Sequence, residues 1–174
     1  MKIEKRYLNA ALEVANFKKG KEILQCVHFT KDGRLQATDS YILIDINLNI
    51  TFERDFSIKL DKDLIDLLSS ENARLTFTDD KLTIETPNKA VSININDSPY
   101  PDFDYIFKTV STGELSEISL SDIVLSKVVK VMKALNAFSI SLEMPRGSMN
   151  SFEITFNGLD NIRFIATPVR KNND

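Results

Sequence analysis

The residue types that usually carry catalysis or bind metal ions are sparse in this sequence of 174 residues. His28 is its single histidine, which leaves a zinc site without a second imidazole, and Cys26 is expected to be a small buried hydrophobe. Asp61, Lys62 and Asp63 lack the glycine and the distal glutamate of a calcium loop. The sequence has no glycine-rich phosphate loop and no Gly-x-Ser-x-Gly turn. We therefore predict a protein that is not an enzyme and that binds neither a metal ion nor a cofactor.

Lysines at helical spacing are compatible with a different chemistry, which is contact with the phosphates of nucleic acid. In the third predicted helix, apolar side chains share one arc at about 100° per residue, whereas Lys130 and Lys133 fall roughly opposite and Lys127 falls on the flank. Such lysines make sequence-independent, salt-sensitive contacts with duplex DNA, although a solvated helix face has the same pattern. Further positive charge surrounds the first predicted helix. The residues that we predict to face duplex DNA are Lys5, Arg6, Lys18, Lys127, Lys130 and Lys133.

The elements that must position these residues recur three times along the chain. Each unit contains a short strand, an amphipathic helix and then strands separated by turns. The units are residues 1–50, 51–108 and 109–174; we expect the first two to form one domain (1–108) and the third to be half of another. The predicted helices are residues 7–17, 60–71 with Asp61 as N-cap, and 121–137 with Ser121 or Asp122 as N-cap. The predicted strands are residues 22–29, 34–38, 42–49, 55–59, 74–78, 81–86, 89–95, 116–120, 139–143, 151–156 and 161–167.

This order of elements predicts an α+β fold in which helices cover one face of antiparallel sheets. Since a unit has a single helix to cover its sheet, we expect the units to pair face to face. Residues 98–114 contain two prolines and a glycine and indicate an irregular connector before the third unit.

Composition limits the class of protein further. Apolar residues at 43% and charged residues at 27% are typical of a folded globular chain. A net charge of -3 argues against a protein that coats nucleic acid through bulk positive charge. The lone cysteine fits a reducing compartment, and we find neither a signal peptide nor an apolar run that could span a membrane. We therefore expect a cytoplasmic protein.

Three motifs follow one another in an order found in a known family. Residues 37–39 read Ala-Thr-Asp, Ser40 stands where the family has Gly, and Ile42 stands where it has Arg. Residues 100–103 read Tyr-Pro-Asp-Phe and resemble the family's Phe-Pro-Asp-Tyr, and residues 164–170 resemble its last strand. With these motifs the chain resembles the bacterial DNA sliding clamp, the DNA polymerase III beta subunit. The resemblance implies a shortened form, in which the first two units correspond to the middle domain and the third to the second half of the last domain.

The resemblance also implies a site. Sliding clamps perform no chemistry; they encircle duplex DNA and hold short peptides of polymerases and of the clamp loader in a surface pocket. Such a pocket suits a short amphipathic peptide, although the same apolar residues could instead fill the core and the interface between units. The residues that the resemblance places in the pocket are Leu24, Thr38, Ser40, Tyr41, Leu43, Pro101, Tyr105, Ile106, Ile165, Pro168, Val169 and Arg170.

Two functions remain open on the sequence. The first is a clamp-like replication accessory protein that assembles into a homo-oligomer and tethers replication enzymes to duplex DNA. The oligomer would be a tetramer that supplies the twelve units of a ring, or a dimer in which two third units pair across a two-fold axis. The second is a protein-interaction module that does not encircle DNA and acts as a decoy or adaptor for clamp-binding proteins.

Overall fold

The computed structural model of the protein describes residues 1–15, 21–109, 119–143 and 151–168. Its helices are α1 (Lys5–Ala15), the 3-10 helix η1 (Glu22–Gln25), α2 (Lys62–Leu68), α3 (Phe103–Thr109) and α4 (Asp122–Leu135). Its strands are β1 (Val27–Phe29), β2 (Arg34–Thr38), β3 (Ile42–Asn47), β4 (Phe56–Ile58), β5 (Arg74–Phe77), β6 (Lys81–Thr86), β7 (Lys89–Asn94), β8 (Ile140–Glu143), β9 (Phe152–Phe156) and β10 (Ile162–Ala166). The predicted α+β class with antiparallel sheets is confirmed, and β2 and β6 have the predicted bounds.

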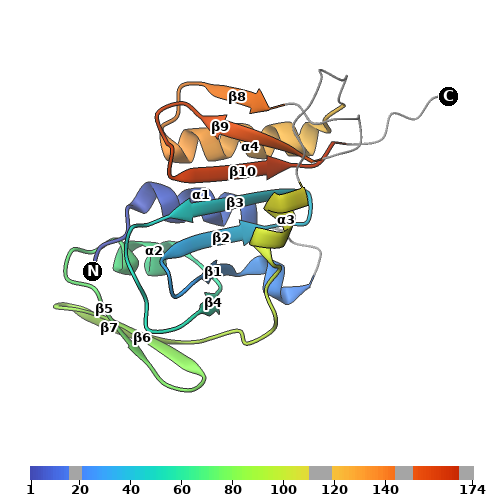
Figure 1. Ribbon diagram of the computed structural model, residues 1–174. Helices are drawn as coiled ribbons and strands as arrows, with labels where there is room; N and C mark the ends of the chain where they lie inside the picture. The colour runs from blue at the N-terminus through green and yellow to red at the C-terminus, as the bar shows by residue number, and fades with distance from the viewer. Residues whose placement is uncertain (16–20, 110–118, 144–150, 169–174) are drawn as a thin grey trace.

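A seven-stranded antiparallel sheet forms the main layer of the molecule, in the order β4-β1-β2-β3-β10-β9-β8. Helices α1, α2 and α4 lie behind this sheet in Figure 1, and β5, β6 and β7 form a separate small sheet. The strands of the first and third units meet where β3 pairs with β10, with Ile44 opposite Phe164. The main sheet therefore continues across the predicted boundary at residue 109.

The pairing of β3 with β10 corrects one expectation. The first and third units join edge to edge in one sheet, and do not pair face to face as predicted. An edge-to-edge join satisfies the backbone N–H and C=O groups of both strands while α1 and α4 pack side by side on the same face. One apolar core then serves both units, with Phe29, Phe152 and Phe164 among its fully buried side chains.

Local chemistry explains where the helices begin and end. The Asp61 carboxylate accepts a hydrogen bond from the Leu64 backbone N–H at 2.8 Å, as its prediction as N-cap requires. The Ser121 hydroxyl accepts the corresponding bond from Val124 at 3.2 Å at the start of α4. That helix ends at Leu135, and its C-cap Asn136 takes the left-handed conformation that commonly ends helices.

Two segments differ from their predicted structure. Residues 22–25 were expected to begin a strand, but they form η1, because Ile23 and Cys26 are buried at the three-residue spacing of a 3-10 turn. The predicted irregular connector contains α3. The predicted strand at 116–120 lies outside the described residues up to 118, and residues 119–120 are not in a strand.

A glycine turn sets the connection between β1 and β2. Gly33 has a φ of 87°, and a Cβ at this position would collide with the carbonyl oxygen of Ile50.

Among the residues that the structure describes, no helix is long and apolar enough to cross a membrane. The same part of the chain holds no group of three or more His, Cys, Asp or Glu side chains arranged to hold a metal ion.

Candidate functional site

Helix α3 docks on the sheet face opposite α1 and α4, at the junction of the first and third units (Figure 1). Phe103 and Phe107, one helical turn apart, are buried against Leu43 of β3 and Ile165 of β10. The Asp102 carboxylate accepts a hydrogen bond from the Tyr105 backbone N–H at 3.0 Å and so caps the first turn. An N-cap aspartate followed by two phenylalanines at i, i+4 spacing was the signal in the sequence that could have predicted this helix.

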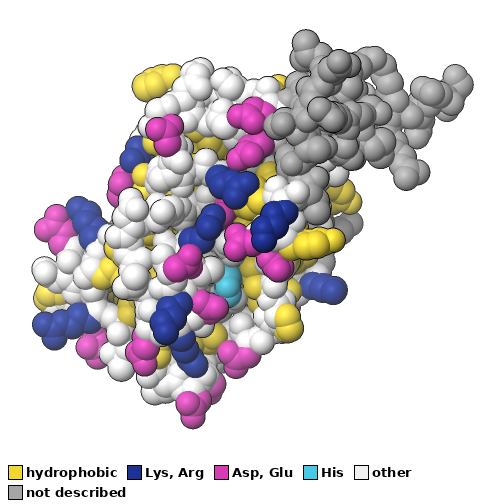
Figure 2. Space-filling view, in the orientation of Figure 1, with side chains coloured by type: hydrophobic (Ala, Val, Ile, Leu, Met, Phe, Trp, Pro, Cys, Tyr) yellow, Lys and Arg dark blue, Asp and Glu magenta, His cyan; other side chains and the backbone are white. Residues whose placement is uncertain are grey.

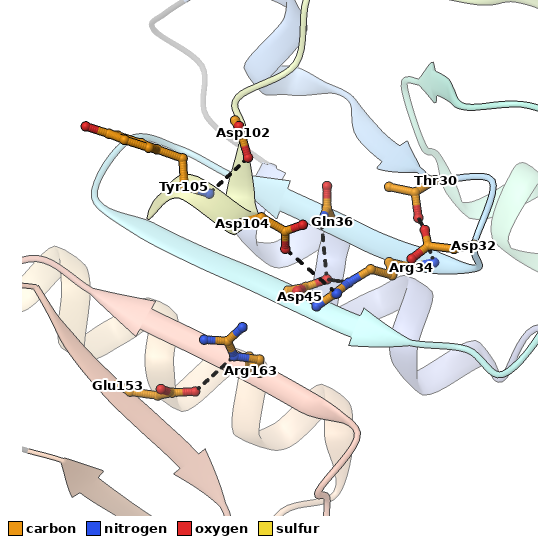
Figure 3. A network of polar contacts seen from close by, with 10 residues as sticks. All are labelled: Thr30, Asp32, Arg34, Gln36, Asp45, Asp102, Asp104, Tyr105, Glu153 and Arg163. Atoms are coloured by element: carbon orange, nitrogen blue, oxygen red, sulfur yellow. Dashed lines mark hydrogen bonds and ion pairs between the residues drawn. The ribbon is translucent and has the colours of Figure 1, made fainter. Parts of the chain in front are cut away.

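A polar network on the same face ties α3 to the sheet (Figure 3). Asp45 of β3 is completely buried, and its carboxylate accepts hydrogen bonds from the Arg34 guanidinium, one of them at 3.0 Å, and from the Gln36 amide at 3.4 Å. Arg34 also approaches the Asp104 carboxylate of α3 at 3.9 Å. Since a buried carboxylate is stable only when it is paired and hydrogen-bonded, this cluster holds β2, β3 and the start of α3 in one arrangement.

An arginine of the third unit completes the docking of α3. The Arg163 guanidinium lies over the Phe107 ring, 3.4 Å from its centroid, and its Nε is 3.4 Å from the Glu153 carboxylate. This stacking adds a cation–π attraction to the apolar contact below the ring.

The turn between β2 and β3 carries the Thr-Asp-Ser motif and is stabilised by hydrogen bonds to a buried side chain of its own. Asp39 is buried, and its Oδ1 accepts hydrogen bonds from the backbone N–H groups of Tyr41 and Ile42, both at 2.9 Å. The Thr38 hydroxyl donates to the Ile42 carbonyl oxygen at 2.8 Å. Ser40 has a φ of 79°, a conformation that favours glycine, and this explains structurally why a glycine is suited to this position.

Lys127 of α4 stabilises the turn through an ion pair. Its ammonium group donates to the second oxygen of the Asp39 carboxylate at 2.5 Å and to the Val14 carbonyl oxygen of α1 at 3.2 Å. The side chain is 14% exposed, so little of Lys127 is accessible for the DNA contact that we predicted from its place on the flank of the helix. Its position on the flank of the apolar arc brings it against α1, because α1 and α4 pack side by side.

A pocket of about 700 Å³ opens between this turn, the connector before α3 and the end of β10. The backbone N–H of Thr167 donates to the Tyr41 carbonyl oxygen at 2.8 Å and joins the third unit to the turn at the rim. The volume is within the range of about 300–1,000 Å³ that small-ligand and peptide sites occupy. The pocket is lined by Lys21, Ile23, Leu24, Thr38, Ser40, Tyr41, Ile42, Leu43, Pro99, Tyr100, Pro101, Ile106, Ser151, Ile165 and Thr167.

The structure brings eight of the twelve predicted pocket residues to this lining: Leu24, Thr38, Ser40, Tyr41, Leu43, Pro101, Ile106 and Ile165. Tyr105 does not line it; its side chain is 67% exposed because α3 turns the ring outward, as Figure 3 shows. Pro168 is buried and is not part of the lining either. Val169 and Arg170 lie outside the described residues.

Seven lining residues were not predicted: Lys21, Ile23, Ile42, Pro99, Tyr100, Ser151 and Thr167. Ile42, Pro99, Tyr100 and Thr167 lie within or beside the three motifs, and that proximity was the signal that could have found them. Lys21 and Ser151 carry no such signal, because the tertiary fold alone brings them to the rim.

Tyr100 forms the wall between the pocket and a small buried cluster. Its ring stacks on His28 with centroids 4.7 Å apart, and its hydroxyl lies 3.3 Å from the Cys26 carbonyl oxygen, to which it donates. Burial raises the pKa of the Tyr100 hydroxyl and of the Cys26 thiol, and burial lowers the pKa of His28. At neutral pH all three groups are therefore uncharged.

The remaining residues predicted to face DNA are distributed unevenly. Lys130 and Lys133 are exposed on α4, on the side opposite the apolar stripe that faces the sheet. Lys5 pairs with Asp66 at 2.6 Å and Arg6 pairs with Glu4 at 2.7 Å, whereas Lys18 lies outside the described residues. On the sheet face in Figure 2, basic and acidic side chains are interspersed, so that face has no continuous positive surface.

Neither protein-family models nor curated proteins match the sequence. Solved structures do match the fold. The DNA polymerase III beta subunit of Borrelia burgdorferi superposes with a TM-score of 0.71 at 16% identity and covers 95% of this chain. The corresponding subunit of Thermotoga maritima gives a TM-score of 0.70 at 15% identity over 96% of the chain. The Helicobacter pylori beta clamp, solved with a bound DNA ligase peptide, gives 0.64 at 15% identity over 98%.

The protein therefore has the fold of the DNA polymerase III beta sliding clamp, as the three motifs indicated. The matched regions make up 61%, 62% and 64% of those three clamps, so this chain spans about three fifths of their length.

Proposed function

We propose that this protein is a non-enzymatic, clamp-like accessory protein of DNA replication that recruits replication enzymes through the pocket beside α3. The observation that carries the proposal is the pocket's place in the fold, between the turn at Asp39, the connector at Pro101 and the end of β10. One of the clamps with this fold is solved with a DNA ligase peptide. The expected ligand is a short peptide with apolar side chains, held by an apolar lining with a few hydroxyl groups at the rim.

Two exposed tyrosines supply a matched test of the pocket. Tyr41 is 53% exposed and lines the pocket, whereas Tyr105 is 67% exposed and does not. Both can be replaced by Asp without opening the core. With a fluorescein-labelled copy of the DNA ligase peptide as the probe, fluorescence anisotropy should give a Kd about tenfold higher for Tyr41→Asp, which corresponds to about 1.4 kcal/mol. Tyr105→Asp should bind as the unchanged protein does. Equal effects of the two substitutions would contradict the assignment of the pocket.

We further propose that helix α4 contacts duplex DNA without sequence preference, through Lys130 and Lys133. Both lysines are exposed on the same side of α4. If each contacts one phosphate, replacing both with Ala should reduce the slope of log K against log salt concentration by about two. A matched control is Lys62→Ala with Lys89→Ala on the second unit, outside the proposed contact, which should leave the slope unchanged.

The ion pairs of the other basic residues favour a second candidate function. Lys127 pairs with Asp39, Lys5 with Asp66 and Arg6 with Glu4, so part of the predicted positive charge is neutralised within the molecule. A decoy or adaptor that binds clamp-interacting proteins would need the pocket but no DNA contact. Peptide binding together with no measurable binding to duplex DNA at about 50 mM salt would support this second candidate and contradict the DNA-contact proposal.

A further inference from the structure

Helix α3 and the peptide pocket share one pair of side chains in the main sheet. Leu43 of β3 lies directly opposite Ile165 of β10, and both residues line the pocket. The same two side chains are buried against Phe103 and Phe107 of α3. Contact with α3 therefore fixes two residues of the pocket wall.

The helix and the connector before it also supply pocket residues of their own. Ile106 of α3 lines the pocket, and so do Tyr100 and Pro101 just before the helix. If α3 moved away from the sheet, Ile106 would leave the pocket and the pair of Leu43 and Ile165 would be uncovered. The pocket is therefore complete only while α3 is docked.

Helix α3 is too short to be stable without the sheet. It contains seven residues, and isolated helices shorter than about 12–15 residues are marginal in water. Its stability must therefore come from contacts with the sheet, and elements that depend on few contacts are the ones that open locally.

Two arginines of the sheet contact α3 from different units. Near the start of the helix, Arg34 of β2 is 3.9 Å from Asp104, whose side chain is 72% exposed, so water weakens this pair (Figure 3). Near its end, the Arg163 guanidinium of β10 lies 3.4 Å from the centroid of the Phe107 ring, and Phe107 is buried. The contact of Arg163 is thus the closer of the two, and it acts on a ring that packs against the pocket wall.

Glu153 of β9 orients the Arg163 side chain. Its carboxylate is 3.4 Å from the Arg163 Nε, and the Glu153 side chain is 22% exposed. The guanidinium group therefore has a carboxylate at its edge and an aromatic ring at its face, an arrangement that suits a planar arginine better than a lysine.

We propose that Arg163 is a positioning residue of the peptide pocket, which stacks on Phe107, keeps α3 docked on the sheet and thereby keeps Ile106 in the pocket wall. The inference rests on the proposed function of the pocket. Arg163 does not line the pocket itself, so its effect on a ligand passes through α3. A ligand that needs the complete pocket binds in proportion to the fraction of molecules in which α3 is docked.

Amide hydrogen exchange measures the docking of α3 without any ligand. Arg163→Gln removes the cation and should make the amides of α3 exchange about two- to fivefold faster, the factor expected for a cation–π contact at a partly exposed site. Exchange in β6, which belongs to the separate small sheet, should not change. Arg163→Lys keeps a positive charge and should recover part of the protection. Unchanged exchange of α3 in Arg163→Gln would overturn the proposal.

Peptide affinity tests the link from α3 to the pocket. With the fluorescein-labelled DNA ligase peptide as the probe, Arg163→Gln should raise the Kd about twofold or more, because fewer molecules have the complete pocket. Saturating peptide should in turn slow the exchange of the α3 amides in the unchanged protein, since the coupling is reciprocal.

Arg54→Gln is the matched control. The Arg54 guanidinium lies 5.5 Å from the centroid of the Phe77 ring, in a contact of the same kind, and neither residue lines the pocket. This substitution should change neither the exchange of α3 nor the Kd of the peptide. An equal rise in Kd for Arg54→Gln and Arg163→Gln would overturn the proposal, because a general loss of stability would then account for both.

The two measurements separate this inference from the proposed function. Faster exchange of α3 in Arg163→Gln with an unchanged Kd would overturn the positioning role and leave the proposed function intact. If the unchanged protein did not bind the peptide, the proposed function would be refuted, and the exchange of α3 would decide alone whether Arg163 keeps the helix docked.

Discussion

Replacing Asp39 with Asn removes the negative charge that forms an ion pair with Lys127 beneath the turn between β2 and β3. The Asp39 side chain is 2% exposed and the Lys127 side chain 14% exposed, so water can screen little of their attraction. The Asn oxygen can still accept the bonds from Tyr41 and Ile42, but its amide would face the Lys127 ammonium group as a second donor. We therefore expect the substitution to act mainly on the ion pair and less on the turn itself.

The size of the expected loss in the free energy of unfolding follows from the burial of the two partners. Breaking a buried pair by removing one partner costs about 3–5 kcal/mol. Lys127 keeps its hydrogen bond to the Val14 carbonyl oxygen and remains partly exposed to water. The cost of Asp39→Asn should therefore be near the lower end of this range, at about 3 kcal/mol. For a chain of this size that corresponds to a fall in Tm of roughly 6–12 °C. Lys127→Met leaves the buried Asp39 carboxylate with only its two backbone donors and should also cost about 3 kcal/mol.

A double-mutant cycle measured by urea unfolding separates the pair from its surroundings. The variant with both Asp39→Asn and Lys127→Met should be more stable than the sum of the single changes predicts, by about 1.5–3 kcal/mol. The exposed pair of Lys89 and Asp63 is the control, with side chains 50% and 77% exposed, and its coupling should be below about 1 kcal/mol. Equal coupling in the two cycles would refute the conclusion that Lys127 is a structural residue of the turn.

Two further predictions concern the turn and the buried cluster behind it. Ser40→Gly should raise the free energy of unfolding by about 0.5–1 kcal/mol in thermal denaturation, because it relieves the strain of a positive φ, whereas Ser40→Ala should give no gain. Burial lowers the pKa of His28 below its ordinary value of 6.5, so the unfolded chain takes up this proton more readily than the folded one. Stability from this group is complete well above pH 6.5 and should decline as the pH falls below 6.5. His28→Gln should remove that decline in urea unfolding measured at each pH, and an unchanged pH profile would contradict it.

The sequence alone determined the elements whose signals are local. The bounds of β2 and β6 follow from short apolar and β-branched runs between turn residues, and Asp61 and Ser121 start their helices through side-chain oxygens a few residues from the backbone groups that they bind. The α+β class follows from the same repeated order of elements. These features depend on contacts within a few residues, which a sequence pattern records directly.

The tertiary structure alone decided how the units join and which side chains meet. The edge pairing of β3 with β10 brings Ile165 to the pocket across more than a hundred residues of chain, and helix α3 forms where Phe103 and Phe107 find an apolar surface made by both strands. Lys127 has the spacing of a residue on the helix flank, yet its side chain is only 14% exposed, because it pairs with Asp39, 88 residues away. A pattern of residue types records the periodicity of one helix or strand, but it does not record which partner that element meets in the fold.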